Sequence, residues 1–291
     1  MKELKILAVI VLFTGITYWG VEPLAHSIFH PHVEPADYKF SDLKAVDTSI
    51  QGDVEAGKEA VAMNCTACHS IESQGFSAPM DAEMSAQSYG VVPPDLSNAG
   101  YMYETNFFAN FLKDPAKALK LEHKFGENRA FPMPGYGWMS DQDIMNIVAY
   151  FQSIAPKKLT NREVFVDACG RCHDMNYAKL DGDAIVAKTP DAIIKKYMGS
   201  IPPDLSMMIR SRGEHYLETF INDPQKQLHG TAMPRVGLTE HSQEQVVAFL
   251  EEIGDSKKEE REGIAWWVIG FMVIFSFVAF LWKRQIWDEV H

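Results

Sequence analysis

Two long apolar stretches lie at the ends of this 291-residue chain, and amphipathic segments fill the region between them. The second stretch, residues 264–282, carries no charge and is long enough to cross a bilayer as a helix. The first, residues 6–21, is shorter, so a cleaved signal peptide is the alternative to a retained anchor. Because no clear A-x-A cleavage site follows it, we expect an uncleaved anchor.

The region between the two stretches repeats one order of elements, which indicates a duplicated unit. Each copy has a short helical segment, a helix that ends near an Asp-Pro pair and a final amphipathic helix. The patterns Ser140-x-x-Asp143 and Ser242-x-x-Gln245 predict where the two final helices begin. No segment reads as a strand. We therefore predict an all-α protein with two tandem domains between two transmembrane helices.

The pattern sets the boundaries of the predicted segments. They are an N-terminal anchor at 1–25, a periplasmic connector at 26–50, a first domain at 51–154, a linker at 155–160, a second domain at 161–255, a solvated tether at 256–263, a C-terminal anchor at 264–282 and a cytoplasmic tail at 283–291. Each domain has about 100 residues, a size that buries limited apolar surface. A covalently bound porphyrin could complete such a core.

The strongest chemical signal is a five-residue motif that occurs once in each repeat. The copies are Cys65-Thr66-Ala67-Cys68-His69 and Cys169-Gly170-Arg171-Cys172-His173. C-x-x-C-H attaches haem c, because the two thiols form thioethers with the porphyrin and the histidine binds the iron. The chain has four cysteines, and the two motifs use all of them. We therefore predict two covalently bound haem c groups.

Two other readings of the cysteines compete with haem attachment. One is a thioredoxin-like redox dithiol, and the other is half of a zinc site. A dithiol does not need the histidine in both copies, and a zinc site leaves the Met-Pro pairs described below unexplained. The formal charge of −12 argues against a nucleic-acid partner. An acidic surface could steer a basic redox partner, although solubility alone also explains it.

Each repeat also contains a Met-Pro pair before its final helix, at Met133 and Met233. A thioether opposite the histidine raises the potential of a haem. Their matched positions favour Met133 and Met233 as the second iron ligands. The rival side chains are Met80, Met102, Met139, Met207, Met208, His123, His229 and His241. The order of an early C-x-x-C-H and a later Met-Pro resembles class I cytochromes c, which implies two tandem class I domains.

A Pro-Pro-Asp-Leu-Ser segment follows the haem motif in both repeats, at residues 93–97 and 202–206. Proline fixes φ and has no N–H, so these segments form stiff, extended loops. A plain turn is the alternative, but recurrence in both repeats weakens it. We expect Pro94 and Pro203 to pack against a haem edge.

The second of these segments carries a more specific resemblance. Residues 199–206, followed by Arg210 and Arg212, resemble the G-x-x-PPDLS-x3-R-x-R segment of cytochrome c1. The resemblance implies that Arg210 or Arg212 pairs with a haem propionate, as a buried carboxylate requires. With two haem motifs and two anchors, the chain is most similar to the dihaem cytochrome c1 subunits of some bacterial quinol–cytochrome c reductases.

The charges beside the apolar stretches predict the topology. Lys2 and Lys5 precede the first stretch, and Lys283 and Arg284 follow the second. The positive-inside rule then places both termini in the cytoplasm. The haem domains would lie in the periplasm of a bacterium, where c-type haem is attached, with the anchors in the lipid of the inner membrane.

The resemblance implies an electron-transfer subunit of a reductase rather than a catalyst alone. It would accept electrons from a Rieske iron–sulfur protein, beside a cytochrome b subunit, and pass them to a periplasmic cytochrome c or a terminal oxidase. Such complexes are dimeric in the family. The alternative is the dihaem subunit of a cbb3-type oxidase, against which the C-terminal anchor and the R-x-R segment argue. A dihaem peroxidase is less favoured, because it needs an open iron while both repeats offer a methionine.

Overall fold

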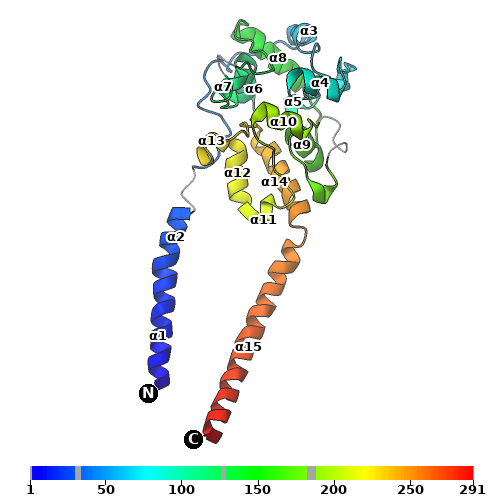
Figure 1. Cartoon of the computed structure of the whole chain (residues 1–291). Helices are drawn as coiled ribbons and strands as arrows, with labels where there is room; N and C mark the ends of the chain where they lie inside the picture. The colour runs from blue at the N-terminus through cyan, green and yellow to red at the C-terminus, as the bar shows by residue number, and fades with distance from the viewer. Residues whose placement is uncertain (1, 30–33, 126–128, 182–187, 291) are drawn as a thin grey trace.

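The computed structural model describes residues 2–29, 34–125, 129–181 and 188–290. Within these ranges the chain is helical, and extended pairing is limited to isolated bridges such as Ile71 with Phe76. The prediction of an all-α protein is confirmed. Figure 1 shows a helical region from which the first and last helices extend on the same side.

The first helices form one continuous rod. Helix α1 (Lys2–Ile16) passes through a π-helical turn at Thr17–Val21 into α2 (Glu22–Phe29). Residues Glu3–Phe29 are long and apolar enough to cross a membrane. The helix extends four residues beyond the predicted end of the anchor at residue 25.

The last helix, α15 (Lys258–Val290), is also long and apolar enough to span a bilayer over Lys258–Asp288. It includes most of the predicted tether at 256–263, because the charged side chains there form local ion pairs. Lys257 Nζ lies 2.6 Å from Glu260 Oε1, and Arg261 Nη2 lies 2.8 Å from Asp255 Oδ2. The charged residues therefore extend the helix towards the second domain.

The free ends of the two terminal rods lie near each other. Lys283 Nζ of α15 is 3.2 Å from Glu3 Oε1 of α1. In Figure 1 the marked N- and C-termini lie at the same end of the molecule. Both termini are therefore on the same side of any membrane that the two helices cross.

The first unit packs its opening helix across its final helix. Its helices are α3 (Val54–Asn64), α4 (Ala82–Tyr89), α5 (Ala99–Met102), α6 (Thr105–Lys113), α7 (Pro115–Ala118) and α8 (Asp141–Ile154). Helix α3 crosses α8 at Gly57, where an added Cβ would lie 2.0 Å from the carbonyl oxygen of Asn146. Glycine permits an approach of the two backbones that no larger residue allows.

Replacing Gly57 with alanine should destabilise the first unit by about 3 kcal/mol or more, the upper part of the usual range for overpacking. The Asn146 carbonyl belongs to helix backbone and has little freedom to move away. The measurement is the guanidinium midpoint of the full chain in detergent. Gly263→Ala is the matched control, because no atom lies within 4 Å of its added Cβ. Equal midpoints for the two variants would contradict the prediction.

The second unit repeats this arrangement. Its helices are α9 (Asn161–Ala168), α10 (Asp191–Met198), α11 (Met208–Arg212), α12 (Glu214–Asn222), α13 (Pro224–Gln227) and α14 (Glu240–Gly254). Helix α9 packs on α14, where the rings of Phe165 and Phe249 are 4.9 Å apart. In both units an Asp-Pro pair ends one helix and begins the next, since proline is well suited to a first helical position.

The capping patterns gave one correct and one wrong boundary. Ser140 and Asp143 form a reciprocal capping box at the start of α8, as predicted. The pattern at Ser242 is wrong, because Thr239 is the N-cap of α14 and accepts a hydrogen bond from the Ser242 N–H. The helix begins three residues earlier because a second hydroxyl residue supplies the cap.

The described part of the connector, residues 34–50, packs against both units. Phe40, Leu43 and Val46 have exposed fractions of 1%, 7% and 5%. The Asp37 N–H donates to Asn222 in the second unit, and the Ala45 N–H donates to Asn110 in the first. The connector therefore joins the two units in addition to linking them to α2.

Candidate haem-binding sites

Each C-x-x-C-H motif begins where a helix ends. Helix α3 ends at Asn64, and the N–H groups of Cys68 and His69 both donate to the Cys65 carbonyl. Helix α9 ends at Ala168, and Cys172 and His173 repeat these bonds to Cys169. The tight turn brings both sulfurs and the histidine of one motif close together, as thioether attachment with axial ligation requires.

The histidine of each motif is oriented by the Pro-Pro loop of its own unit. The Nδ1 atoms of His69 and His173 lie 2.8 Å from the carbonyl oxygens of Pro94 and Pro203, respectively. An Nδ1–H that donates to a carbonyl leaves Nε2 with a free lone pair, the form in which histidine binds a metal. Burial lowers the pKa of both histidines, which favours this neutral form.

The rest of the first loop is fixed by bonds that the second loop repeats. The Leu96 N–H donates to the Ser70 carbonyl at 2.9 Å, and Asp95 accepts from the Glu72 N–H at 2.9 Å. Ser97 accepts from the Ser73 N–H at 3.0 Å. Each residue of the motif after the prolines therefore has its own bond to the segment that follows the histidine.

The second loop makes the equivalent contacts. Leu205 donates to the Asp174 carbonyl at 2.9 Å, Asp204 accepts from Asn176 at 2.8 Å, and Ser206 accepts from Tyr177 at 3.0 Å. The Pro-Pro-Asp-Leu-Ser segment is thus a support for the histidine, and it is more specific than a plain turn.

The two Met-Pro pairs pack beside the motifs of their own units. Met133, Cys65 and Leu96 belong to one hydrophobic cluster. Met233, Cys169 and Leu205 belong to the equivalent cluster in the second unit. In each unit, residues from three segments that are far apart in sequence therefore share one hydrophobic cluster.

Several rival methionines occupy other environments. Met102 and Met139 are core residues with exposed fractions of 2% and 5%, and Met102 packs in the cluster of the second unit although it lies in α5 of the first. Met207 is 43% exposed. Met208 packs against the same cluster as Met233, so the matched Met-Pro position in each repeat, and not burial alone, favours Met133 and Met233.

The thiols do not have the properties of a redox dithiol. Burial, together with the neighbouring cysteine, raises the pKa of Cys65 and of Cys169 to about 12. A reactive dithiol needs a lowered pKa, so both thiols would be poor nucleophiles at neutral pH. Within the described ranges, no three His, Cys, Asp or Glu side chains gather as metal ligands, so the zinc alternative lacks a ligand set.

Two buried polar groups beside the motifs indicate where a haem would fit. The Nε of Arg171 and the hydroxyl of Tyr197 are buried and lack a hydrogen-bond partner in the described structure. Buried polar groups normally have partners, so an unpaired guanidinium Nε and an unpaired hydroxyl near a cofactor motif suit a group with acceptor oxygens. Haem propionates provide such oxygens.

The two arginines implied by the cytochrome c1 resemblance lie in α11 and are exposed. Arg210 Nε is 3.9 Å from Asp255 Oδ1, and the Arg212 guanidinium lies 5.3 Å from the centre of the Tyr216 ring. Sequence reasoning did not select Arg171, although it lies inside the second motif. The feature that could have identified Arg171 is its positive charge directly before Cys172 in the C-x-x-C-H motif.

Residues beside the first motif contact the second unit. Tyr89 Oη lies 3.8 Å from Cys68 Sγ, and an added Cβ at the next residue, Gly90, would lie 2.7 Å from the Tyr197 ring. Burial raises the pKa of Tyr197, and the Cys172 thiol adds to the increase. Tyr89 and Gly90 thus link the surroundings of Cys68 to Tyr197 of the second unit.

A buried threonine forms a second connection between the sites. The Thr189 hydroxyl accepts from the Val92 N–H at 3.0 Å, directly before the first Pro-Pro pair. The Thr189 N–H donates to the Arg171 carbonyl at 3.0 Å, inside the second motif. Thr189 has no exposed surface. The separation of the two sites is therefore fixed by hydrogen bonds as well as by packing.

Comparisons with known proteins identify one domain type. Residues 54–155 match the sequence model of the cytochrome c family. The chain is 27% identical over 111 residues to a cytochrome c of Tetrahymena pyriformis, covering 37% of this chain and 94% of that protein. It is 29% identical over 102 residues to cytochrome c-554(548) of Halomonas halodenitrificans, covering 35% and 96%. The chain therefore contains a cytochrome c domain, and haem c is the cofactor of that domain.

One solved structure is similar over most of the chain. It is described as a hyperthermophilic respiratory complex III, with 20% identity, 98% coverage of this chain, 99% coverage of that chain and a TM-score of 0.32. A TM-score this low does not establish a shared fold. The assignment of a c-type cytochrome is based on the family match and on the geometry of the motifs.

Proposed function

We propose that this chain, which contains a cytochrome c domain at residues 54–155, is a membrane-anchored dihaem cytochrome that serves as the cytochrome c1 subunit of a quinol–cytochrome c reductase. It would accept electrons from a Rieske iron–sulfur protein and pass them to a periplasmic cytochrome c or a terminal oxidase. Both termini would be cytoplasmic, and both haem domains would lie in the periplasm at the inner membrane of a bacterium.

The observation that carries the proposal of two haems is the repetition of the complete histidine support. His69 with Pro94 and His173 with Pro203 have the same Nδ1-to-carbonyl distance of 2.8 Å. The family match covers the first unit, and the second unit reproduces its contacts. When bound, a haem c in each unit supplies a reversible one-electron couple.

The protein residues would attach, orient and shield each haem. Cys65, Cys68 and His69 would hold the first haem with Met133 as the second iron ligand. Cys169, Cys172, His173 and Met233 would do so in the second unit. Arg210, Arg212 and the buried Arg171 are the candidate partners for propionates.

The contact between the units supports transfer between the haems without domain motion. Tyr89 lies beside Cys68, the neighbouring Gly90 packs against Tyr197, and Thr189 bonds to both units. A fixed separation would let electrons pass between the two haems without movement of either unit. The two units would thus act as one relay.

The terminal helices favour the reductase over a cbb3-type oxidase subunit. An anchor at the C-terminus, α15, accompanies the N-terminal one, and Lys283 lies beside Glu3 at their common end. A peroxidase would need one iron with an open position, whereas each unit places a methionine in the cluster of its haem motif.

The deciding experiment is mild detergent extraction of the tagged full chain followed by identification of the proteins that come with it. We expect a b-type cytochrome and a Rieske iron–sulfur protein in equal amounts with the chain, and two haem c per chain by pyridine haemochrome. Copper-containing oxidase subunits would support the oxidase alternative. One haem c per chain would contradict the dihaem assignment.

A further inference from the structure

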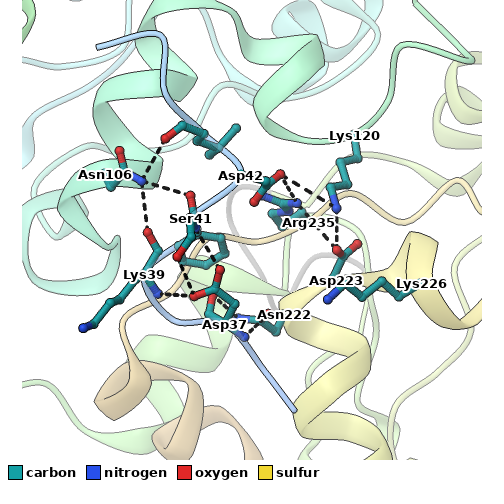
Figure 2. A network of polar contacts seen from close by, with 12 residues as sticks. Asp37, Lys39, Ser41, Asp42, Asn106, Lys120, Asn222, Asp223, Lys226 and Arg235 are labelled. Atoms are coloured by element: carbon teal, nitrogen blue, oxygen red, sulfur yellow. Dashed lines mark hydrogen bonds and ion pairs between the residues drawn. The ribbon is translucent and has the colours of Figure 1, made fainter. Parts of the chain in front are cut away.

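An ionic cluster around the buried side chain of Arg235 lies directly beside the Met233–Pro234 pair. Arg235 follows that pair, and its side chain is 2% exposed. Its Nη1 and Nη2 donate to Asp42 Oδ1 and Oδ2 at 3.0 and 2.8 Å, a two-point contact shown in Figure 2. The Phe40 ring lies 5.5 Å from the guanidinium carbon, and Asp223 Oδ2 lies 3.5 Å from Nη2.

The cluster joins three parts of the chain that are distant in sequence. Asp42 belongs to the connector, and Asp223 ends α12 of the second unit. Lys120 of the first unit lies 2.5 Å from Asp223 and 3.9 Å from Asp42. The backbone N–H of Arg235 donates to the carbonyl of Leu119 at 3.2 Å. Figure 2 shows Asp42, Lys120, Asp223 and Arg235 converging at this point.

The residues after Arg235 are also fixed against the first unit. The Gly237 carbonyl accepts from the Glu104 N–H at 3.0 Å, and the Thr239 N–H donates to the Met102 carbonyl at 2.8 Å. Gly237 has φ 77°, and an added Cβ would lie 2.0 Å from the Phe107 ring. The segment that follows Met233 is therefore built on the first unit.

The equivalent segment in the first unit is anchored within its own unit. The Tyr136 N–H donates to the Leu112 carbonyl at 2.9 Å. The Tyr136 hydroxyl donates to the Asn64 carbonyl, also at 2.9 Å, directly before the first cysteine. Within the described residues, the loop at 134–139 makes no hydrogen bond or ion pair with the connector or the second unit. The two methionine loops therefore differ in what holds them.

The charges in the cluster make the contact strong and hard to replace. Burial acts to raise the pKa of Asp42, but the hydrogen bonds and positive charge of Arg235 outweigh it and hold that pKa below its ordinary value. Asp42 is therefore ionised at neutral pH. Arg235 is almost fully buried, so removal of the Asp42 carboxylate would take away its two-point contact and leave Asp223, 3.5 Å from Nη2, as its carboxylate partner.

We propose that Arg235 is a positioning residue that, held by Asp42, keeps Met233 on the iron of the second haem, so that ligation in the second unit depends on the connector and the first unit. This inference rests on the proposed function, in which Met233 is an iron ligand. A thioether is a neutral ligand, and hydroxide or a deprotonated lysine competes with it as pH rises. Retention of the thioether therefore depends on how firmly its loop is held.

The test uses Asp42→Asn, which preserves the shape of the side chain and removes its charge. The full chain should carry Asp42→Asn together with Met133→His. The second substitution removes the thioether from the first haem, so the near-infrared thioether-to-iron band then comes from the second haem. We expect the pH at which half of that band is lost to fall by roughly one unit, a tenfold change in the ligand-exchange equilibrium. Asp42→Glu should restore most of the shift.

Tyr136→Phe is the matched variant for the other loop. In a chain with Met233→His, it should shift the pH at which the first haem loses its band, whereas Asp42→Asn should not. A variant that acted only by destabilising the whole protein would lower the pH of band loss for both haems. Should Asp42→Asn fail to accumulate, Lys120→Gln tests the same cluster and should give a smaller shift in the same direction, confined to the second haem.

Three results would overturn the inference, and they are distinguishable. If Met233→His removes a thioether band while Asp42→Asn leaves that band and its pH dependence unchanged, Met233 is a ligand and Arg235 does not position it. If Met233→His leaves the spectrum unchanged, the ligand assignment fails and the inference fails with it. Equal shifts of both haems in Asp42→Asn would also contradict it.

Discussion

Replacing Met133 or Met233 with histidine should remove one of two thioether-to-iron bands and lower the potential of the affected haem. Imidazole stabilises oxidised iron relative to a thioether, and axial ligands set haem potentials over a range of about 0.8 V, so a drop on the order of 0.1 V or more is expected. Each variant should leave the other haem unchanged. The measurements are the near-infrared spectrum and a redox titration of the full chain.

The control for each variant is a methionine that the structure places in a core. Met139 is 5% exposed and packs in the cluster of the first unit, and Met102 is 2% exposed in that of the second. Met139→Leu and Met102→Leu remove a thioether without a predicted ligand role and should leave both bands in place. If neither histidine variant changes the spectrum, Met133 and Met233 are not the ligands.

Local patterns predicted the parts of the sites that depend on neighbours in sequence. The turn from Cys65 to His69 follows from a helix end, and the loop at Pro94 follows from proline stereochemistry. The cap at Ser140 follows from its own side chain and that of Asp143. In the turn and the cap, the interacting groups lie within a few residues of one another. The Pro94 loop lies farther from His69, but the same Pro-Pro pattern occurs in both repeats.

Contacts between distant segments were outside the reach of those patterns. Arg235 and Asp42 are separated by 193 positions, and nothing near either residue indicates the other. The connector at 26–50 was predicted only as a link between the first anchor and the first domain, because its buried residues, Phe40 among them, show no period. The wrong cap at Ser242 has a related cause, since Thr239 offers an equally good hydroxyl.

The duplication explains both the similarity and the difference of the two units. The histidine supports at Pro94 and Pro203 are the same, because each uses residues of its own repeat. The methionine loops differ, because the second one lies against the first unit, where Leu119 and Lys120 are available. The two units are repeats of one another, but the methionine loop of the second unit is bonded to the first unit. We call two such unequal units an ordered pair.

An ordered pair allows a defined direction of electron flow. The second unit carries the segment that resembles cytochrome c1, and it is joined directly to α15 through Asp255 and Lys258. In Figure 1 the second unit lies nearer than the first to α15, a helix long enough to span a membrane, and quinol oxidation in a reductase takes place at the membrane. We therefore expect the second haem to receive electrons from the Rieske protein and the first haem to pass them outward.

Replacing His173 should stop the reduction of both haems by quinol, whereas replacing His69 should leave the second haem reducible. The reason is that electrons entering at the second haem would reach the first across the contact at Tyr197 and Thr189. The measurement is stopped-flow reduction of the isolated complex, with the haem content of each variant determined first. Chemical reduction by dithionite is the control, since it should reach any haem that remains bound. The opposite pattern, with His69 essential for both haems, would place the first unit beside the Rieske protein and leave the dihaem assignment intact.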